Sequence, residues 1–589
     1  MTAPAPMFGV AQSLTGRRWI GPDAETERMG LAIAQQARMP EIVGRILAAR
    51  GILPEDAADY LSPTLRALMP DPSIIADMDL AAERLASAVT RGERIAIFGD
   101  YDVDGGASTA ILIDWLRQLG MAATPYIPDR IDEGYGPNEA AMAALAEAHD
   151  LILCVDCGTL SHGPIAAAKG ADVIIADHHL AGETLPDALA VVNPNRADDT
   201  SDLGHLCAAG VVFMLLAAAN RILRGQGRFA SQREPDLRGM LDLVALATVA
   251  DVAPLTGLNR AFVRQGLSVI AGRGRPGIAA LSDCAGLTAR PTSTDLGFAL
   301  GPRINAGGRI GEADLGMRLL TTTDPNEARA LADRLDELNR KRREIEAQVL
   351  AAATEQIEQR DYEAPLVWAA AEGWHPGVVG IVASRLKDRF HRPAIVIGLD
   401  GAEGKGSGRS VPGVDLGRAV GALAGEGVLL KGGGHVMAAG LTVAAERVEE
   451  AMAALTARID AAEAMRAGPG DLVIDGALMP GAATPDLVET LESAGPFGPA
   501  NPAPRIVFGQ VQIAHFRIVG KGHAQIRVSA GKERGLDAIA FRAEESGLAQ
   551  AFSSAFETAG AMHVAGTLEI DDWGGRRRAK LRVEDAAPA

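Results

Sequence analysis

The chain has 589 residues, of which 48% are hydrophobic and 4% aromatic, and its formal charge is -18. So long a chain exceeds one hydrophobic core, and about three or four domains are expected. Four scattered cysteines exclude a disulfide framework, and the net charge, taken alone, argues against a nucleic-acid partner because affinity for phosphate comes mainly from Lys and Arg.

Residues 1–80 form the first predicted region. They contain an amphipathic helix over 41–49 and a second helix over 56–61, followed by a proline-rich bend. We expect this region to pack against the first lobe. Arg17-Arg18 is not followed by a long apolar stretch, so no export signal is predicted. No run long enough to span a membrane is expected, and the cytoplasm is the expected compartment.

Three short apolar runs alternate with helix-like segments in residues 81–323. The runs cover 94–99, 151–155 and 172–176, and the helix-like segments cover 107–119, 138–148 and 164–169. Continuous apolar runs are typical of strands that are covered on both faces. The alternation therefore predicts an α/β lobe with a doubly wound parallel sheet.

Carboxylates and imidazoles follow these apolar runs, where ligands of such sheets gather. They are Asp100, Asp102 and Asp104, then Asp156, then Asp177-His178-His179, and Asp251 follows a further apolar run. Hard oxygen ligands joined by imidazole suit Mn²⁺ or Mg²⁺. Two such ions, roughly 3.5 to 4 Å apart, activate water and polarise a phosphoryl oxygen. The pattern predicts hydrolysis of a phosphate ester or anhydride.

Each piece also has an ordinary interpretation. A single Asp after a strand is commonly a helix cap or a turn residue. The Asp-x-Asp-x-Asp-Gly run could be half of a calcium loop, but Ile111 stands where that loop needs its glutamate. The spacing of Cys154 and Cys157 matches a redox or zinc motif, yet it begins inside an apolar run, and a structural role is favoured.

A long helix is predicted over 325–359, within a connecting segment at 324–360. Asp324 can cap it, Pro325 stands at its first position, and Glu327 completes a capping box. Its leucine seam could form a coiled-coil dimer, but the seam is short and broken at Arg342.

A second lobe is predicted over 361–467. Strands are expected at 366–371 and 394–398, with a helix starting at 377–386. Glycine-rich loops at 404–408 and 432–434 would let backbone N–H groups approach a phosphate, and Arg409 could add a bidentate contact. The alternative is that these glycines only make tight turns.

Residues 468–589 have the pattern of a small antiparallel barrel. Alternating segments lie at 511–518, 524–528, 538–541 and 563–570, separated by glycine-rich turns. Basic residues after the Gly574-Gly575 turn are candidate contacts to a nucleic-acid backbone, with a solvated hairpin as the alternative: Arg576, Arg577, Arg578, Lys580 and Arg582.

The ordered motifs resemble those of the DHH phosphoesterase superfamily and, within it, the RecJ single-strand exonucleases. The resemblance covers most of the chain. Besides the residues above, it is carried by the segments 130–136, 248–255, 301–309, 374–383, 406–410, 432–440 and 496–502.

The resemblance implies a DHH lobe, a connecting helix, a smaller DHHA1 lobe across a cleft, and a C-terminal OB-type barrel that binds single strands. It places two Mn²⁺ or Mg²⁺ ions on catalytic ligands at Asp100, Asp102, Asp104, Asp156, His178, His179 and Asp251. It places substrate contacts at Arg303, Asn305, Arg309, Ser407, Arg409 and His435.

The chain departs from the family pattern at two positions. Many relatives in the superfamily have His where Phe98 stands, so one metal shell is short of a ligand or is completed by water. Ala500 stands where many relatives have Gly.

The implied function is a single-stranded-DNA-specific 5′ to 3′ exonuclease of recombination and repair. The 5′ polarity rests on the resemblance alone. The implied protein is a cytoplasmic monomer that works with a single-stranded-DNA-binding protein and a repair helicase. Two alternatives remain: a phosphodiesterase acting on short RNA or cyclic dinucleotides, and a non-catalytic scaffold that binds single strands. Because the net charge is negative, basic residues must be concentrated in a groove.

Overall fold

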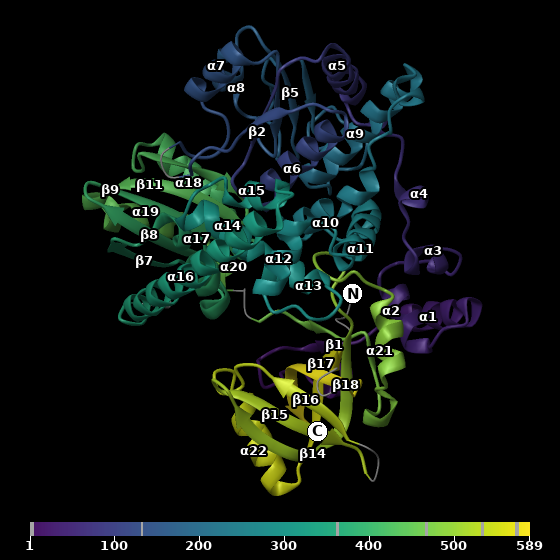
Figure 1. The fold of residues 1–589 in the computed structure, drawn as a ribbon. Coiled ribbons are helices and arrows are strands. Elements are labelled where there is room, and N and C mark those ends of the chain that lie inside the picture. The colour runs from purple at the N-terminus through teal and green to yellow at the C-terminus, as the bar shows by residue number, and fades with distance from the viewer. Residues whose placement is uncertain (1–4, 131–132, 361–363, 466–468, 532–534, 572–575) are drawn as a thin grey trace. The chain divides into compact units, whose positions relative to one another are not determined.

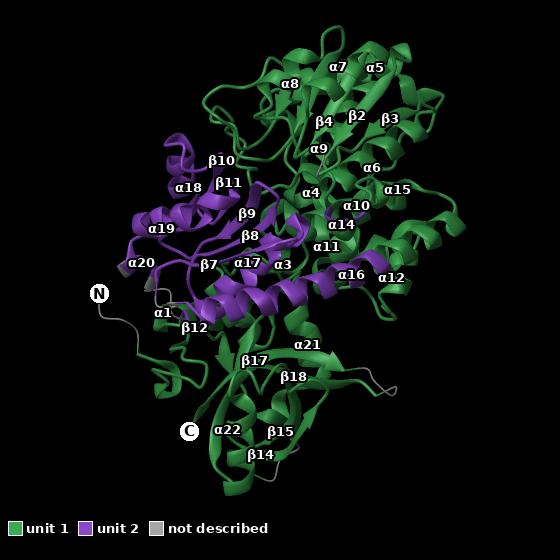
Figure 2. Ribbon diagram, turned by 90° about the vertical axis from the view of Figure 1, so that its left-hand side faces the viewer, with its two compact units in different colours: residues 1–308, 312–336, 471–589 green, residues 309–311, 337–470 purple. Residues whose placement is uncertain are grey.

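The computed structural model describes residues 5–130, 133–360, 364–465, 469–531, 535–571 and 576–589. The chain divides into two compact units (Figure 2). The first comprises residues 1–308, 312–336 and 471–589, and the second comprises residues 309–311 and 337–470. The predicted fold class, with a parallel α/β lobe, a smaller α/β lobe and a barrel, is confirmed.

Five parallel strands in the order β3-β2-β4-β5-β6 form the sheet of the first lobe. Their bounds are Ile95–Gly99 (β2), Ala123–Tyr126 (β3), Leu151–Val155 (β4), Asp172–Ala176 (β5) and Ala190–Val192 (β6). β2 and β4 are buried along their whole length, as continuous apolar runs predict. The three predicted strands are present, and β3 and β6 complete the sheet.

Helices cover both faces of this sheet (Figure 1). Helices α7 (Glu139–Ala148) and α8 (His162–Ala167) share a core with the strands on one face. The other face is covered by α5 (Met78–Arg91), α6 (Val103–Gln118) and α9 (Ala208–Gly225). Contrary to expectation, α9 is long and apolar enough to cross a membrane, but 72% of it is buried inside the protein, as in a core helix.

A helical segment follows the sheet. It contains α10 (Leu241–Ala250), α11 (Gly257–Ala271), α12 (Pro276–Cys284), α13 (Ser293–Asp295), α14 (Gly301–Ile310), α15 (Leu315–Thr321) and α16 (Pro325–Glu358). The predicted long helix is confirmed as α16, which begins within one residue of the expected cap and passes from the first unit into the second.

The C-terminal barrel closes because β14 pairs with both β15 and β17. Its strands are Arg505–Val519 (β14), His523–Ser529 (β15), Leu536–Ala540 (β16), Ala561–Asp571 (β17) and Arg578–Pro588 (β18). The barrel is not wholly antiparallel, because β16 and β18 are parallel. Helix α22 (Leu548–Thr558) connects β16 to β17. The Gly574-Gly575 turn lies outside the described residues.

Helices α1 (Ala24–Ala37) and α2 (Glu41–Ala49) pack against the barrel rather than against the first lobe, contrary to expectation. Ile42, Val43 and Ile46 share one buried core with Val488 and Phe508. The amphipathic pattern gives the buried side of a helix but not its partner. Short helices α3 (Ala57–Leu61) and α21 (Pro485–Glu492) lie in the same unit. Helix α4 (Leu65–Leu68), by contrast, packs against α11 of the first lobe, as expected.

The second unit has a five-stranded sheet in the order β10-β11-β9-β8-β7. The strands are Val367–Glu372 (β7), Ala394–Asp400 (β8), Glu403–Arg409 (β9), Lys431–His435 (β10) and Ala438–Ala444 (β11), and only β7 and β8 are parallel. The helices are α17 (Pro376–Phe390), α18 (Leu416–Gly425), α19 (Val448–Arg458) and α20 (Ala461–Met465).

The two glycine-rich segments of this unit are strands, so their prediction as loops was wrong. Gly404, Gly406 and Gly408 alternate with polar residues along β9. A Cβ on Gly406 would lie 2.8 Å from Leu441 Cδ1 and 3.0 Å from Ile397 Cγ1. These alternate positions are glycine because the core beneath β9 leaves no room for a side chain.

Candidate metal centre

Six of the predicted ligands come from the carboxyl ends of β2, β4 and β5 or the adjacent first turn of α6. Asp100 and Asp102 follow β2, Asp104 lies in the first turn of α6, Asp156 follows β4, and His178 and His179 follow β5. Asp251 is the C-terminal capping residue of α10. A carboxylate at the negative end of a helix dipole is unfavourable unless a cation lies beside it.

The segment from Asp100 to Gly105 is fixed by backbone geometry. Asp102 Oδ1 accepts hydrogen bonds from the Asp104 and Gly105 amides, at 2.9 and 3.1 Å, and so caps α6. The helix therefore begins at Val103, four residues earlier than predicted. A Cβ on Gly105 would lie 2.5 Å from the Asp100 backbone, which is why glycine ends the motif.

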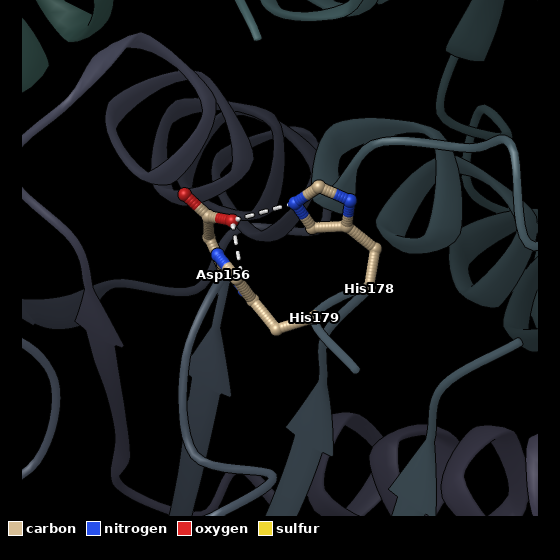
Figure 3. Close-up of side chains that lie close together, drawn as sticks. All are labelled: Asp156, His178 and His179. Atoms are coloured by element: carbon tan, nitrogen blue, oxygen red, sulfur yellow. Dashed lines mark ion pairs between the residues drawn. The ribbon is translucent and has the colours of Figure 1, made fainter. Parts of the chain in front are cut away.

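The side chains converge on one pocket in the first unit. His178 Nε2 lies 3.3 Å from Asp156 Oδ1, and 3.7 Å from both Asp104 Oδ2 and Asp251 Oδ2. Figure 3 shows one carboxylate oxygen of Asp156 paired with both histidines, and His179 Nδ1 lies 3.9 Å from Asp156 Oδ1. All seven predicted ligands belong to three overlapping groups, each with its ligand atoms within 4.8 Å of one another: Asp156, His178 and His179; Asp104, His178 and Asp251; Asp100, Asp102 and Asp156.

Several of these buried atoms have no hydrogen-bond partner within the protein: Asp100 Oδ1, Asp156 Oδ1 and His178 Nε2. Leaving buried polar atoms without a partner is costly. Their ligand types and spacing fit hard divalent cations such as Mn²⁺ and Mg²⁺. Because Asp156 and His178 each belong to two groups, the arrangement has room for more than one ion.

Burial raises the pKa of Asp100, Asp104 and Asp156, and the neighbouring carboxylates raise it further. Burial, together with Asp104 and Asp102, raises the pKa of Asp251 to about 8. In the protein alone, Asp251 therefore binds a proton near neutral pH. A cation that binds beside Asp251 would replace that proton.

Backbone strain also marks the site. Asp156 has a φ of 61°, in the left-handed region that non-glycine residues seldom adopt, and Val252 next to Asp251 has a φ of 62°. Such strain persists where the surroundings over-determine it, and it is common at functional sites.

Phe98 contributes nothing to the pocket. It is fully buried in β2 and stacks on Tyr126, with ring centroids 5.2 Å apart. No imidazole therefore stands at this position, but Asp100, two residues further on, brings a buried carboxylate to the Asp102 and Asp156 group.

Residues outside the predicted set hold the imidazoles in place. Asp177 accepts hydrogen bonds from His179 Nδ1 at 2.8 Å and from the Thr159 hydroxyl at 2.6 Å. Burial lowers the pKa of His179, but the bond to Asp177 outweighs it and raises the pKa to about 9. Partners of this kind fix the orientation of metal ligands.

Asparagines and a tyrosine complete this supporting layer. Asn193 and Asn195 donate to the His179 and His178 carbonyls, at 2.8 and 2.6 Å. The Tyr135 hydroxyl donates to the Asp156 carbonyl at 2.9 Å. Asn193 follows β6, so the same rule of polar residues after strands would have found it had the short strand been recognised.

Two of the predicted substrate contacts in the first unit have partners within the protein. Arg303 Nε lies 2.8 Å from Asp336 Oδ1, and Arg303 also donates to the Ala299 carbonyl. Asn305 Oδ1 accepts from the Val103 amide at 3.1 Å and so supports the Asp102–Asp104 segment. Their expected role in phosphate binding stays a prediction.

Three of the predicted contacts of the second unit lie on its sheet, where Ser407, Arg409 and His435 share one face; the fourth, Arg309, lies on α14. Arg409 and His435 both face Ala438 across neighbouring strands, and Ser407 lies two residues from Arg409 on β9. Arg409 Nη1 donates to Ser407 Oγ at 3.0 Å. Arg309 donates to the Gly377 carbonyl at 3.2 Å.

This face is open over β10 and β11. Gly433 and Gly440 face each other there, and a Cβ on either would meet nothing within 4 Å. On β9 the same face is approached by α17, where a Cβ on Gly380 would lie 3.0 Å from Ser407 Oγ. The sheet thus presents a polar surface with exposed glycines, bordered on one side by α17.

The fold and the candidate metal centre together are those of a DHH phosphoesterase. The description "DHH family, N-terminal domain" matches residues 94–248, and "DHHA1 domain" matches residues 363–461. "RecJ OB domain" matches residues 474–585.

The whole-chain comparisons are more specific. The chain is 40% identical over 572 residues to the single-stranded-DNA-specific exonuclease RecJ of Dickeya dadantii, covering 93% of this chain and 96% of that one. RecJ of Thermus thermophilus in complex with Mn²⁺ is 29% identical with a TM-score of 0.78, over 97% of this chain and 79% of that one. The same protein in complex with Mg²⁺ is 28% identical with a TM-score of 0.73, over 97% and 78%. The chain belongs to the RecJ family.

Proposed function

We propose that this chain is a single-stranded-DNA-specific exonuclease that hydrolyses phosphodiester bonds from the 5′ end. The observation that carries the proposal is the convergence of buried atoms without hydrogen-bond partners, from Asp100, Asp156 and His178, in a pocket of seven carboxylates and imidazoles. The relatives named above, which are single-stranded-DNA-specific exonucleases, support the choice of substrate.

Two divalent ions, Mn²⁺ or Mg²⁺, would be held by Asp100, Asp102, Asp104, Asp156, His178, His179 and Asp251. When bound, they lower the pKa of water and neutralise charge on the phosphoryl oxygens. The chain's own contribution is to fix the ligands. Asp177, Asn193 and Asn195 orient the imidazoles, and burial keeps bulk water away from the carboxylates.

Substrate positioning is assigned to both units. Arg303, Asn305 and Arg309 follow one another along the segment that passes from the first unit to the second. Ser407, Arg409 and His435 share the open face of the second sheet, where uncovered glycines let a sugar–phosphate backbone approach closely. A guanidinium and an imidazole there suit a phosphate.

The proposal includes the biological setting. We place the protein in the cytoplasm, in DNA recombination and repair, as a monomer that receives substrate from a single-stranded-DNA-binding protein and a helicase. The resemblance to RecJ exonucleases supports this setting.

The test is digestion of 5′- and 3′-labelled single-stranded DNA, double-stranded DNA and RNA with Mn²⁺, Mg²⁺ or a chelator. We expect early release of 5′-labelled mononucleotide from single-stranded DNA only, with either ion. Early release of the 3′ label would overturn the polarity. Selective turnover of short RNA or cyclic dinucleotides would favour the first alternative, and binding without digestion would favour the scaffold.

A further inference from the structure

The barrel carries an exposed aromatic ring in a chain that has few of them. Phe541 directly follows β16 and is 48% exposed, although aromatic residues make up only 4% of the sequence. Its neighbours in the strand, Ala538 and Ala540, are buried inside the barrel. Because side chains alternate between the two faces of a strand, Phe541 lies on the outer face of the barrel.

A guanidinium and an imidazole hold this ring. Arg582 Cζ lies 5.3 Å from the centre of the Phe541 ring, and the His523 ring meets it edge-on with centroids 5.3 Å apart. The Arg542 amide donates to His523 Nδ1 at 3.1 Å, which fixes the imidazole. The ring is thus oriented before any ligand arrives.

The surrounding outer face is predominantly basic. Gln525 on β15 is the register partner of Ile539 on β16 and of Arg517 on β14. Ile539 is in turn the partner of Arg582 on β18. Arg517 donates a hydrogen bond to the Gln525 side chain at 2.6 Å. Arg517 and Arg582 are both exposed. The nearby acidic residues Asp537 and Glu584 are paired, with Arg527 at 2.6 Å and with Arg505 at 2.7 Å. Glu569 on β17 also interacts with Arg582, so two exposed guanidinium groups and one neighbouring carboxylate lie on this face.

We infer that Phe541 is a stacking platform for a base of single-stranded DNA, with Arg582 and Arg517 contacting the adjoining phosphates. This inference rests on the proposed function and deepens it. Flat rings beside cationic groups are what single-strand binding needs, because every base has a face that stacks. Strands two and three of an OB-type barrel, here β15 and β16, are a common binding surface.

The chain supplies a matched control in Phe556, on helix α22 of the same barrel. Phe556 is 45% exposed, and among the described residues no second ring or guanidinium lies against it. Isolated exposed rings are ordinary on protein surfaces. We therefore assign no binding role to Phe556.

The experiment measures binding of fluorescent oligodeoxynucleotides to the full-length protein, with chelator present so that nothing is cleaved. We expect Phe541→Ala to weaken binding roughly tenfold, with Phe541→Trp and Phe556→Ala close to wild type. On an oligonucleotide of abasic sites, Phe541→Ala and wild type should bind equally. Arg582→Ala should reduce the slope of log affinity against log salt by about one.

Wild-type affinity in Phe541→Ala would overturn the inference, as would an equal loss on normal and abasic strands. Thermal unfolding of each variant separates lost binding from lost folding, and the Trp variant keeps the test decisive if the Ala variant is unstable. Because binding is measured without divalent ions, the result is independent of whether the chain proves to be a nuclease.

Discussion

The polar groups of the candidate metal centre in the first unit and those of the open sheet face in the second unit differ in burial. In the first, carboxylates are buried, and Asp100 Oδ1 and Asp156 Oδ1 have no hydrogen-bond partner in the protein. In the second, Ser407, Arg409 and His435 stand on a half-buried to exposed surface over bare glycines. The first arrangement suits small cations of high charge. The second suits a large anionic ligand that keeps part of its hydration.

The sharpest way to break this contrast is to remove the carboxylate shared by two of the ligand groups. Asp156→Asn keeps the shape but loses the charge, so we expect hydrolysis of single-stranded DNA to fall roughly a thousandfold. Release of labelled nucleotide per unit time measures this. Asp150→Asn is the matched control, since Asp150 pairs with Arg94 at an exposed site. Retained activity in Asp156→Asn would refute a shared metal ligand.

The second test uses pH. The pKa of Asp251 is raised by burial to about 8, so the folded state binds more protons than the unfolded chain between about pH 4 and pH 8. The contribution of Asp251 to the free energy of unfolding of the metal-free protein is therefore most favourable below the pKa that Asp251 has in the unfolded chain. It is lost as pH rises toward 8. We expect its melting temperature to fall by several degrees between about pH 5 and pH 8, and Mn²⁺ to restore it.

Asp251→Asn should flatten that profile, because an amide neither titrates nor repels its neighbours. A metal-free profile that rises with pH across this range would contradict the assigned shifts.

The third test compares two glycines of the second sheet. Gly406→Ala should cost about 1–3 kcal/mol, because its Cβ meets Leu441 and Ile397 in the core. Gly440→Ala meets open space and should leave the melting temperature unchanged while weakening single-stranded DNA binding. Equal stability of the two variants would refute the packing explanation, and unchanged binding in Gly440→Ala would remove this face from the substrate path.

The smallest expected effect is at Ala500. It has a φ of 58° and is exposed, so a glycine there relieves left-handed strain without losing buried surface. We expect Ala500→Gly to stabilise the protein by about 1 kcal/mol in denaturant unfolding, with catalytic rates unchanged. A destabilised variant would show that the strain is compensated elsewhere.

That the predicted ligands lie together could be inferred from the sequence because the ends of buried strands are readable in it. Continuous apolar runs identified β2, β4 and β5, and parallel strands bring residues that follow them to one edge of a sheet. Asn193 was missed because β6 has only three residues. Asp251 was predicted because it follows an apolar run, but that run is the helix α10 and not a strand.

The structure of the second unit was harder to predict because glycine occurs both in loops and in tightly packed strands. Gly404, Lys405, Gly406, Ser407, Gly408 and Arg409 alternate with the period of a strand, yet glycine content suggested a loop. What decides between a loop and a strand is the packing of Ile397 on β8 and Leu441 on β11, which stand on either side of Gly406 and come from other parts of the chain. The packing of α1 and α2 on the barrel was equally hidden, because burial patterns do not name a partner.

The central claim is that these acidic and imidazole side chains form one centre for paired divalent cations. Titrating Mn²⁺ into the metal-free protein by isothermal calorimetry, beside the Asp156→Asn variant, tests it most directly. We expect two ions per wild-type chain and fewer in the variant. A wild-type chain that binds no Mn²⁺, or a variant that still binds two ions with unchanged affinity, would contradict it.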